Sequence, residues 1–177
     1  MSGEEDVKKM IAKVDEEARK LRDDDKGLEA LSLMEKALVL RHSLYGKDGQ
    51  ELWDACQGMA ELCNQLAMRV LNGGDFSLSL ELLKKAELLS EKDLAGQAST
   101  NNNFAVYYRK IGKLHAALTY LQKCLSIETK LGSAGQADTH LNMCAVMSQL
   151  GRHEPALEHA QEALILLQEE LYVPSVF

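Results

Sequence analysis

Small residues return at intervals along this chain, as pairs seven positions apart. Seven residues are two turns of an α-helix, so both members of a pair lie on one face of the same helix. The pairs are Ala30 and Ala37, Ser79 and Ala86, Ala117 and Cys124, and Ala156 and Ala163, with steps of 49, 38 and 39 residues between them. Small side chains at this spacing let a second helix approach closely. We therefore predict a repeated unit of two packed helices.

Apolar residues around these pairs follow the period of an α-helix. The first stripe, through Val7, Ile11, Val14, Ala18 and Leu21, predicts a helix over residues 4–22. Gly- and Asp-rich segments then separate further periodic stretches. The whole pattern predicts eight helices in antiparallel pairs, forming one domain with units over residues 4–45, 50–91, 97–131 and 137–172.

Composition supports an all-α fold, because the chain of 177 residues has only two prolines and 5% aromatic residues. A two-helix unit cannot bury its apolar face alone, so the repeats are expected to stack as a solenoid. The net charge of −7 argues against a nucleic-acid partner, whose phosphates require Lys and Arg. One segment departs from this acidity, since residues 101–150 carry five basic and two acidic residues.

The cysteines and the hydropathy pattern indicate the cellular compartment in which the protein is expected. Cys56, Cys63, Cys124 and Cys144 fall on apolar helix faces without the spacing of a disulfide scaffold, so free thiols in a reducing compartment are expected. No window approaches the ~18 apolar residues that a membrane span needs, and the N-terminal segment has no apolar signal region. We therefore expect a cytoplasmic protein without a membrane span.

The last two units resemble tetratricopeptide repeats. The motif N-L-A, Y, G-K/D, A-L, a large apolar residue, A-L and an apolar residue is matched by Asn103-Phe104-Ala105, Tyr108, Gly112-Lys113, Ala117-Leu118, Leu121, Cys124-Leu125 and Ile127. It returns as Asn142-Met143-Cys144, Met147, Gly151-Arg152, Ala156-Leu157, Ala163-Leu164 and Leu166. Residues 60–90 and 11–45 match less fully. The resemblance implies a right-handed superhelical solenoid of antiparallel helix pairs.

The first unit is longer than a standard repeat. Ala37-Leu38-Val39-Leu40-Arg41, followed by Leu44 to Asp48, is similar to the extended repeats of kinesin light chains. Gly49-Gln50 stands where those repeats have His-Pro, and the later units lack the motif. The resemblance suggests motor, cytoskeletal or ciliary assemblies as a setting.

In the family, the first helix of each pair lines a concave groove and carries the asparagine of the N-L-A motif there. The matching residues are Asn103 and Asn142, with Gln65 and its neighbour Asn64 in the second unit. A side-chain amide pairs with the backbone of an extended peptide of any sequence. Alternatively, these amides hold the helix pairs together through local hydrogen bonds.

A basic cluster follows these amides along the same helix face. Arg109 and Lys110 lie beyond Asn102 and Asn103, where they would receive an acidic peptide or a terminal carboxylate. The resemblance to a carboxylate clamp is poor, because that pattern needs basic residues in neighbouring repeats. The alternative is an ordinary solvated, charged face.

The chain shows no catalytic constellation. No Ser-His-Asp set, phosphate-binding glycine loop or carboxylate pair is evident, so we expect neither an enzyme nor a cofactor. His140 and Cys144 lie four residues apart, as two metal ligands on one helix would. Without a second pair nearby, no metal site is predicted.

The last predicted helix is apolar on more than one face. Ile165, Leu167, Leu171 and Tyr172 form a candidate assembly surface, for a homodimer or for a further C-terminal segment. The sequence therefore favours a non-enzymatic adaptor that binds a partner protein or peptide in a groove. Its two alternatives are a structural module that assembles through this helix, and a regulatory domain of a larger protein with a catalytic part elsewhere.

Overall fold

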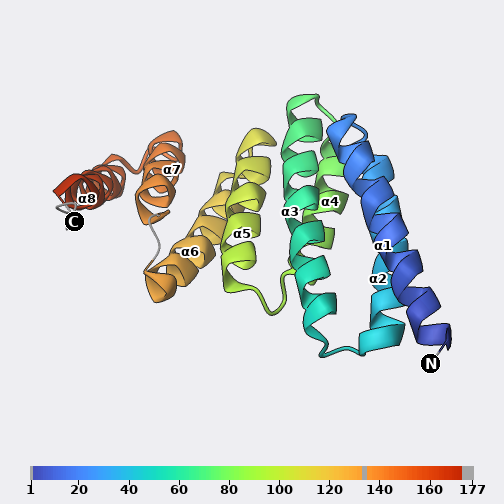
Figure 1. The fold of residues 1–177 in the computed structure, drawn as a ribbon. Coiled ribbons are helices and arrows are strands. Elements are labelled where there is room, and N and C mark those ends of the chain that lie inside the picture. Colours follow the sequence, from blue (N-terminus) through green and yellow to red (C-terminus); the bar gives the residue numbers. More distant parts are fainter. Residues whose placement is uncertain (1, 133–134, 173–177) are drawn as a thin grey trace. The chain divides into compact units, whose positions relative to one another are not determined.

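The computed structural model describes residues 2–132 and 135–172, and every regular element in those residues is a helix (Figure 1). The elements are α1 (Ser2–Asp23), α2 (Gly27–Tyr45), α3 (Gln50–Asn72), α4 (Phe76–Leu89), α5 (Leu94–Lys110), α6 (Leu114–Leu131), α7 (Gln136–Gln149) and α8 (His153–Tyr172). The predicted all-α fold of eight helices is confirmed. Only α5 begins clearly earlier than expected, at Leu94 instead of near Gln97.

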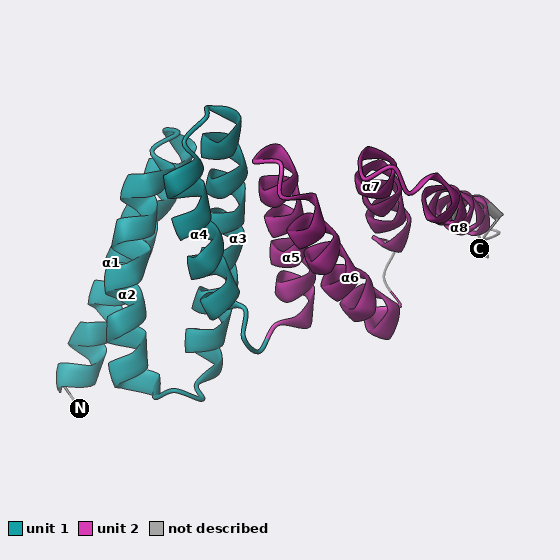
Figure 2. Ribbon diagram, turned by 180° about the vertical axis from the view of Figure 1, so that it is seen from behind, with its two compact units in different colours: residues 1–92 teal, residues 93–177 magenta. Residues whose placement is uncertain are grey.

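The helices divide between two compact units (Figure 2). Unit 1 comprises residues 1–92 with α1 to α4, and unit 2 comprises residues 93–177 with α5 to α8. Within each unit, the extensive helix packing is between helices that follow one another in the chain.

The small-residue pairs lie on the second helix of each pair, in α2, α4, α6 and α8. All eight side chains are at most 4% exposed. Burial of this kind is what the close approach of two helices requires, because a longer side chain would hold the backbones apart. The small residues from which the repeat was predicted are therefore buried in all four of these helices.

The turn inside each helix pair contains one residue with a left-handed backbone. Gly74, Gly112 and Gly151 have φ values of 90°, 78° and 73° in the later three pairs. Asp25 takes the same role in the first pair, with a φ of 61°. A left-handed residue ends the first helix abruptly and lets the chain reverse, and glycine adopts it without steric cost.

Unit 2 is built around a core that α5, α6, α7 and α8 share. Its buried members are Ala105, Ala117, Leu118, Leu121, Met143, Val146, Met147 and Ala156. Next to this core, the ring of Tyr120 on α6 stacks on Phe104 and Tyr108 of α5, with centroid distances of 4.7 and 5.4 Å. This packing fixes α5 and α7 beside one another on α6.

Candidate binding site

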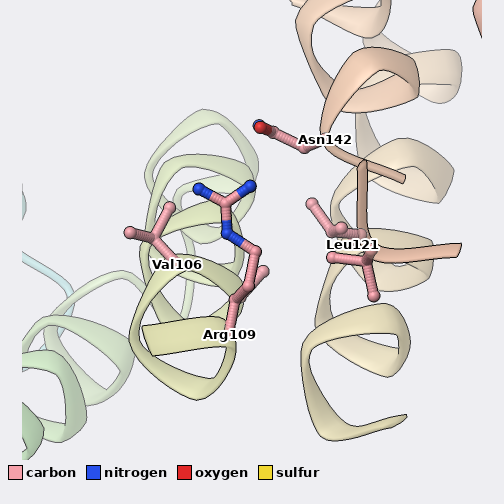
Figure 3. Close-up of a pocket in the computed structure, with 6 residues that line it drawn as sticks. Val106, Arg109, Leu121 and Asn142 are labelled. Atoms are coloured by element: carbon pink, nitrogen blue, oxygen red, sulfur yellow. The ribbon is translucent and has the colours of Figure 1, made fainter. Parts of the chain in front are cut away.

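A shallow pocket lies in unit 2 where α5, α6 and α7 meet (Figure 3). Its walls are Ala105, Val106 and Arg109 of α5, Leu121 of α6, and Asn142 and Val146 of α7. Its cavity volume is about 10 Å³, roughly the room that one water molecule needs. Pockets for small molecules run to roughly 300–1,000 Å³. This pocket is therefore a shallow hollow in the surface, which a partner would lie across and which does not enclose a free metabolite.

Arg109 supplies the positive charge of this pocket. Its side chain is half-buried, and none of the ion pairs among the described residues includes it. Figure 3 shows its guanidinium extending from α5 on the same side of the pocket as the amide of Asn142. A guanidinium offers five N–H donors in a planar fork that matches a carboxylate. The pocket therefore presents donors for an anionic group beside an apolar wall.

Asn142 takes part in a hydrogen bond between helices. Its Nδ2 donates to Oδ1 of Asn102 over 3.1 Å, which joins α7 to α5. This bond uses one of the two N–H groups of Asn142, whose amide also carries an acceptor oxygen. Asn102 and Asn142 are thus brought together as one polar link at the edge of the pocket. The link has the local structural role that the sequence left open, and their contact with a peptide stays a prediction.

The other two candidate residues of unit 2 also lie on α5. Asn103 is half-buried and Lys110 is exposed, and both take part in interactions of their own. Neither lines the pocket, so Arg109 and Asn142 are the two predicted residues that do.

Asn64 and Gln65 lie on α3 in unit 1. Asn64 is only 7% exposed and already takes part in an interaction, whereas Gln65 is exposed and donates from Nε2 to Oε1 of Glu61 over 3.2 Å. A peptide reaches an exposed amide more easily than a buried one. Of these two, Gln65 is thus the better placed, and the role of both in binding remains a prediction.

His140 of α7 contacts His159 of α8, a partner that the sequence pattern did not indicate. Their Nδ1 atoms lie 2.8 Å apart, and both rings are half-buried. One Nδ1 must accept the hydrogen of the other, so the accepting ring is neutral. Burial lowers the pKa of His159 from its usual 6.5, and the charge of His140 lowers it further, against the opposing effect of Glu158 and Glu162. The surroundings of His159 thus favour its neutral form.

The described residues include no group of three or more His, Cys, Asp or Glu side chains placed to hold a metal ion. All four cysteines are free thiols. Burial raises the pKa of Cys63 and that of Cys124 to about 11. Both thiols therefore stay protonated near neutral pH and lack the reactivity of a catalytic cysteine.

The candidate assembly surface of α8 is exposed in the structure. Ile165, Leu167 and Leu171 are 47%, 39% and 85% exposed. The side chain of Tyr172 lies outside the described residues. Exposure alone does not show what this surface contacts, so its role in assembly stays a prediction.

Sequence reasoning missed several residues that the structure places at these sites. Val106 and Leu121 form apolar walls of the pocket, and His159 pairs with His140. The repeat motif marks Leu121 only as a core position and carries no signal for the other two. These roles arise from contacts between different helices, which a motif read along one helix does not show.

Residues 96–169 match the family model described as "Tetratricopeptide repeat". Among curated proteins, no sequence matches the chain significantly. No helix in the described part of the chain is both long and apolar enough to cross a membrane.

Solved structures with similar folds come from several proteins. BtubC (BKLC) from P. vanneervenii has a TM-score of 0.63 and 18% identity, over 97% of this chain and 68% of its own. MamA has a TM-score of 0.61 and 14% identity, over 91% and 80% of the two chains. The putative kinesin light chain repeats of Podosopora anserina have a TM-score of 0.55 and 15% identity, over 92% and 77%. Identities this low show a shared fold only. The resemblance to tetratricopeptide repeats is thereby confirmed, by sequence for residues 96–169 and by fold for the described helices of the rest.

Proposed function

We propose that this chain is a non-enzymatic protein-binding module, and that unit 2 holds an acidic segment of a partner between α5 and α7. Tetratricopeptide repeats are associated with protein–protein interaction, and this chain has their fold. The observation that carries the proposal is the half-buried residue Arg109, which has no acidic partner in the described ion pairs and lines a pocket with Asn142.

The chemistry of the site supports an extended peptide with a carboxylate. A side-chain carboxylate of the peptide would accept two hydrogen bonds from the guanidinium of Arg109. The backbone of the peptide would form hydrogen bonds with the side-chain amide of Asn142. The neighbouring apolar wall, formed by the half-buried Val106, would contact an aliphatic part of the same segment. Lys110 is exposed on the same helix and would add long-range attraction for acidic residues.

The experiment is a fluorescence anisotropy screen of the whole chain against extended peptides, in two matched sets. One set is rich in Asp and Glu, and in the other these residues are replaced by Asn and Gln. We expect binders in the acidic set only. A hydrogen bond to a charged group contributes about 1.5–3 kcal/mol, so Arg109→Gln should weaken binding about tenfold or more.

Lys130→Gln is the matched control, because it removes one exposed positive charge from α6 of the same unit and lies away from the pocket walls. We expect that variant to bind almost as the original chain does. An equal loss of binding affinity in both variants would mean that any positive charge on unit 2 contributes as much as Arg109 does, which would contradict the proposed site. Equal binding of the neutral peptides would contradict the acidic partner.

A further inference from the structure

A larger, open cavity, the α2–α4 hollow, lies in unit 1 between α2 and α4, which run alongside one another (Figure 2). Its volume is about 220 Å³. A cavity of about 150 Å³ takes up a benzene ring, whereas pockets for small molecules begin at roughly 300 Å³. The α2–α4 hollow therefore has room for one large side chain of a partner.

The hollow has an apolar floor and an apolar wall. Four residues of each helix line it, at the spacing i, i+3, i+4 and i+7 from Leu28 on α2 and from Leu78 on α4. Among them, Leu31 and Leu82 are 4% and 3% exposed and form the floor. Leu28 is 46% exposed and Leu78 is half-buried, so both leucines are open to a side chain that enters.

Three charged residues lie on the walls of the same hollow. Glu35 on α2 and Lys85 on α4 form an ion pair across it. The hydrogen bond to Glu35 raises the pKa of Lys85 above its usual 10.5, so Lys85 stays charged at neutral pH. Glu81 is exposed and belongs to none of the ion pairs in the part of the chain that the structure describes. The walls therefore carry one negative charge more than Lys85 neutralises.

Glu81 and the leucine wall are close enough for one side chain to contact both. Leu78 and Glu81 are three residues apart on α4, which is about 4.5 Å along the helix axis. The aliphatic stem of an arginine covers apolar surface over such a distance, and its guanidinium forms two hydrogen bonds with a carboxylate. A guanidinium is also more weakly hydrated than the ammonium group of lysine, so it loses less hydration in a partly apolar hollow. Residues 1–92 carry 19 acidic and 14 basic residues, which favours the approach of a cation.

We propose that the α2–α4 hollow binds an arginine side chain of a partner protein. The stem of this arginine packs against Leu28 and Leu78, and its guanidinium pairs with Glu81. Because Glu81 also acts electrostatically on Lys85, positive and negative groups then alternate from the bound guanidinium to the ion pair on the wall. This site takes a cation and does not depend on the pocket beside Arg109.

The test titrates the ¹⁵N-labelled whole chain with a short, capped peptide of Gly and Ser that has Leu-Arg-Leu at its centre. A second peptide has citrulline in place of arginine, which keeps the shape of the side chain but replaces the guanidinium by a neutral urea group. Amide chemical shifts are followed by NMR. We expect the arginine peptide to shift amides of residues 28–35 and 78–85 in a saturable manner. The citrulline peptide should bind about tenfold more weakly, because it cannot form hydrogen bonds between charged groups.

Four variants separate the contributions of the hollow. Glu81→Gln should weaken binding of the arginine peptide about tenfold, because the guanidinium loses its charged acceptor. The matched control is Glu87→Gln, which removes an exposed negative charge from the same helix away from the walls and should bind almost as the original chain does. Leu28→Ser should weaken both peptides about fivefold through lost apolar contact, whereas Met10→Ser, at an exposed position of α1, should leave binding unchanged. The NMR spectrum of each variant verifies its fold.

Four results would overturn the proposal. The first is that the arginine peptide causes no saturable shifts in the residues of the hollow. The second is equal binding of the two peptides, which would make the occupant a neutral side chain. The third is an equal loss of affinity in Glu81→Gln and Glu87→Gln, which would mean that any negative charge on α4 contributes as much as Glu81 does. The fourth comes from light scattering of the chain alone: a dimer that Glu81→Gln converts to a folded monomer would make a second copy the occupant.

Discussion

Ser79 offers a direct test of the small-residue pattern. It occupies the position held by Ala30, Ala117 and Ala156 in the other three pairs, and its side chain is 0% exposed. Its Oγ is buried and has no hydrogen-bond partner. A hydroxyl here gains nothing from the protein and has lost its water, so replacement by alanine should increase stability.

The expected gain follows from two effects. A buried polar group without a partner costs about 1–3 kcal/mol. Alanine also has a better helix propensity than serine, by about 0.5 kcal/mol, and Ser79 lies inside α4. The small void left by the missing oxygen offsets part of this. We therefore expect Ser79→Ala to raise the free energy of unfolding by about 1–2 kcal/mol and the Tm by roughly 2–4 °C per kcal/mol.

Ser90 is the matched control at the end of the same helix. It is also 0% exposed, but its Oγ donates to the backbone oxygen of Ala86. Ser90→Ala removes a satisfied bond, so it should lower the free energy of unfolding by about 0.5–1.5 kcal/mol. Urea unfolding followed by far-UV circular dichroism measures both variants. An unchanged or lowered stability of Ser79→Ala, with the normal loss in Ser90→Ala, would refute the reasoning.

Two further predictions concern the turns and the histidine pair. Gly112→Ala should lower the free energy of unfolding by about 1–2 kcal/mol, because φ is 78° and the cost is purely conformational, no atom lying within 4 Å of the added Cβ. Gly58→Ala, which also meets open space but lies inside α3, should raise it by about 0.5–1 kcal/mol; equal effects of the two in urea unfolding would contradict this assignment. Because folding lowers the pKa of His159, the unfolded chain binds a proton at this residue more readily than the folded chain does. The contribution of neutral His159 to the free energy of unfolding is therefore present above pH 6.5 and is lost as the pH falls below that value. Thermal unfolding from about pH 7 to about pH 5 should show a smaller loss in His159→Gln than in the original chain, whereas the exposed His115→Gln should show the original slope.

The sequence predicted the fold well because the signals are local. Small-residue pairs, helical stripes and turn glycines each depend on residues within two helical turns, and each signal recurs with the repeat. The position of Arg109 on the same helix face as Asn102 was also accessible, since the two residues lie seven positions, or about two turns, apart. These features need no knowledge of which helix packs against which.

The rest of the candidate site depends on contacts between helices. The bond between Asn102 and Asn142 joins residues 40 positions apart. The contact between His140 and His159 depends on the rotation of α8 against α7, so His140 was considered only with Cys144 on its own helix. Asn64 shows the same limit, because its neighbour Gln65 is exposed while Asn64 is buried, a difference of one position around the helix.

The packing of each helix against its neighbours in the chain has a kinetic consequence. Contacts close in sequence cost little loop-closure entropy, so each unit should have a low contact order and fold rapidly. The same arrangement makes α8 the least stable helix of unit 2, since it packs extensively only against α7 among the described helices. The backbone amides of α8 should therefore exchange their hydrogens faster than those of α6.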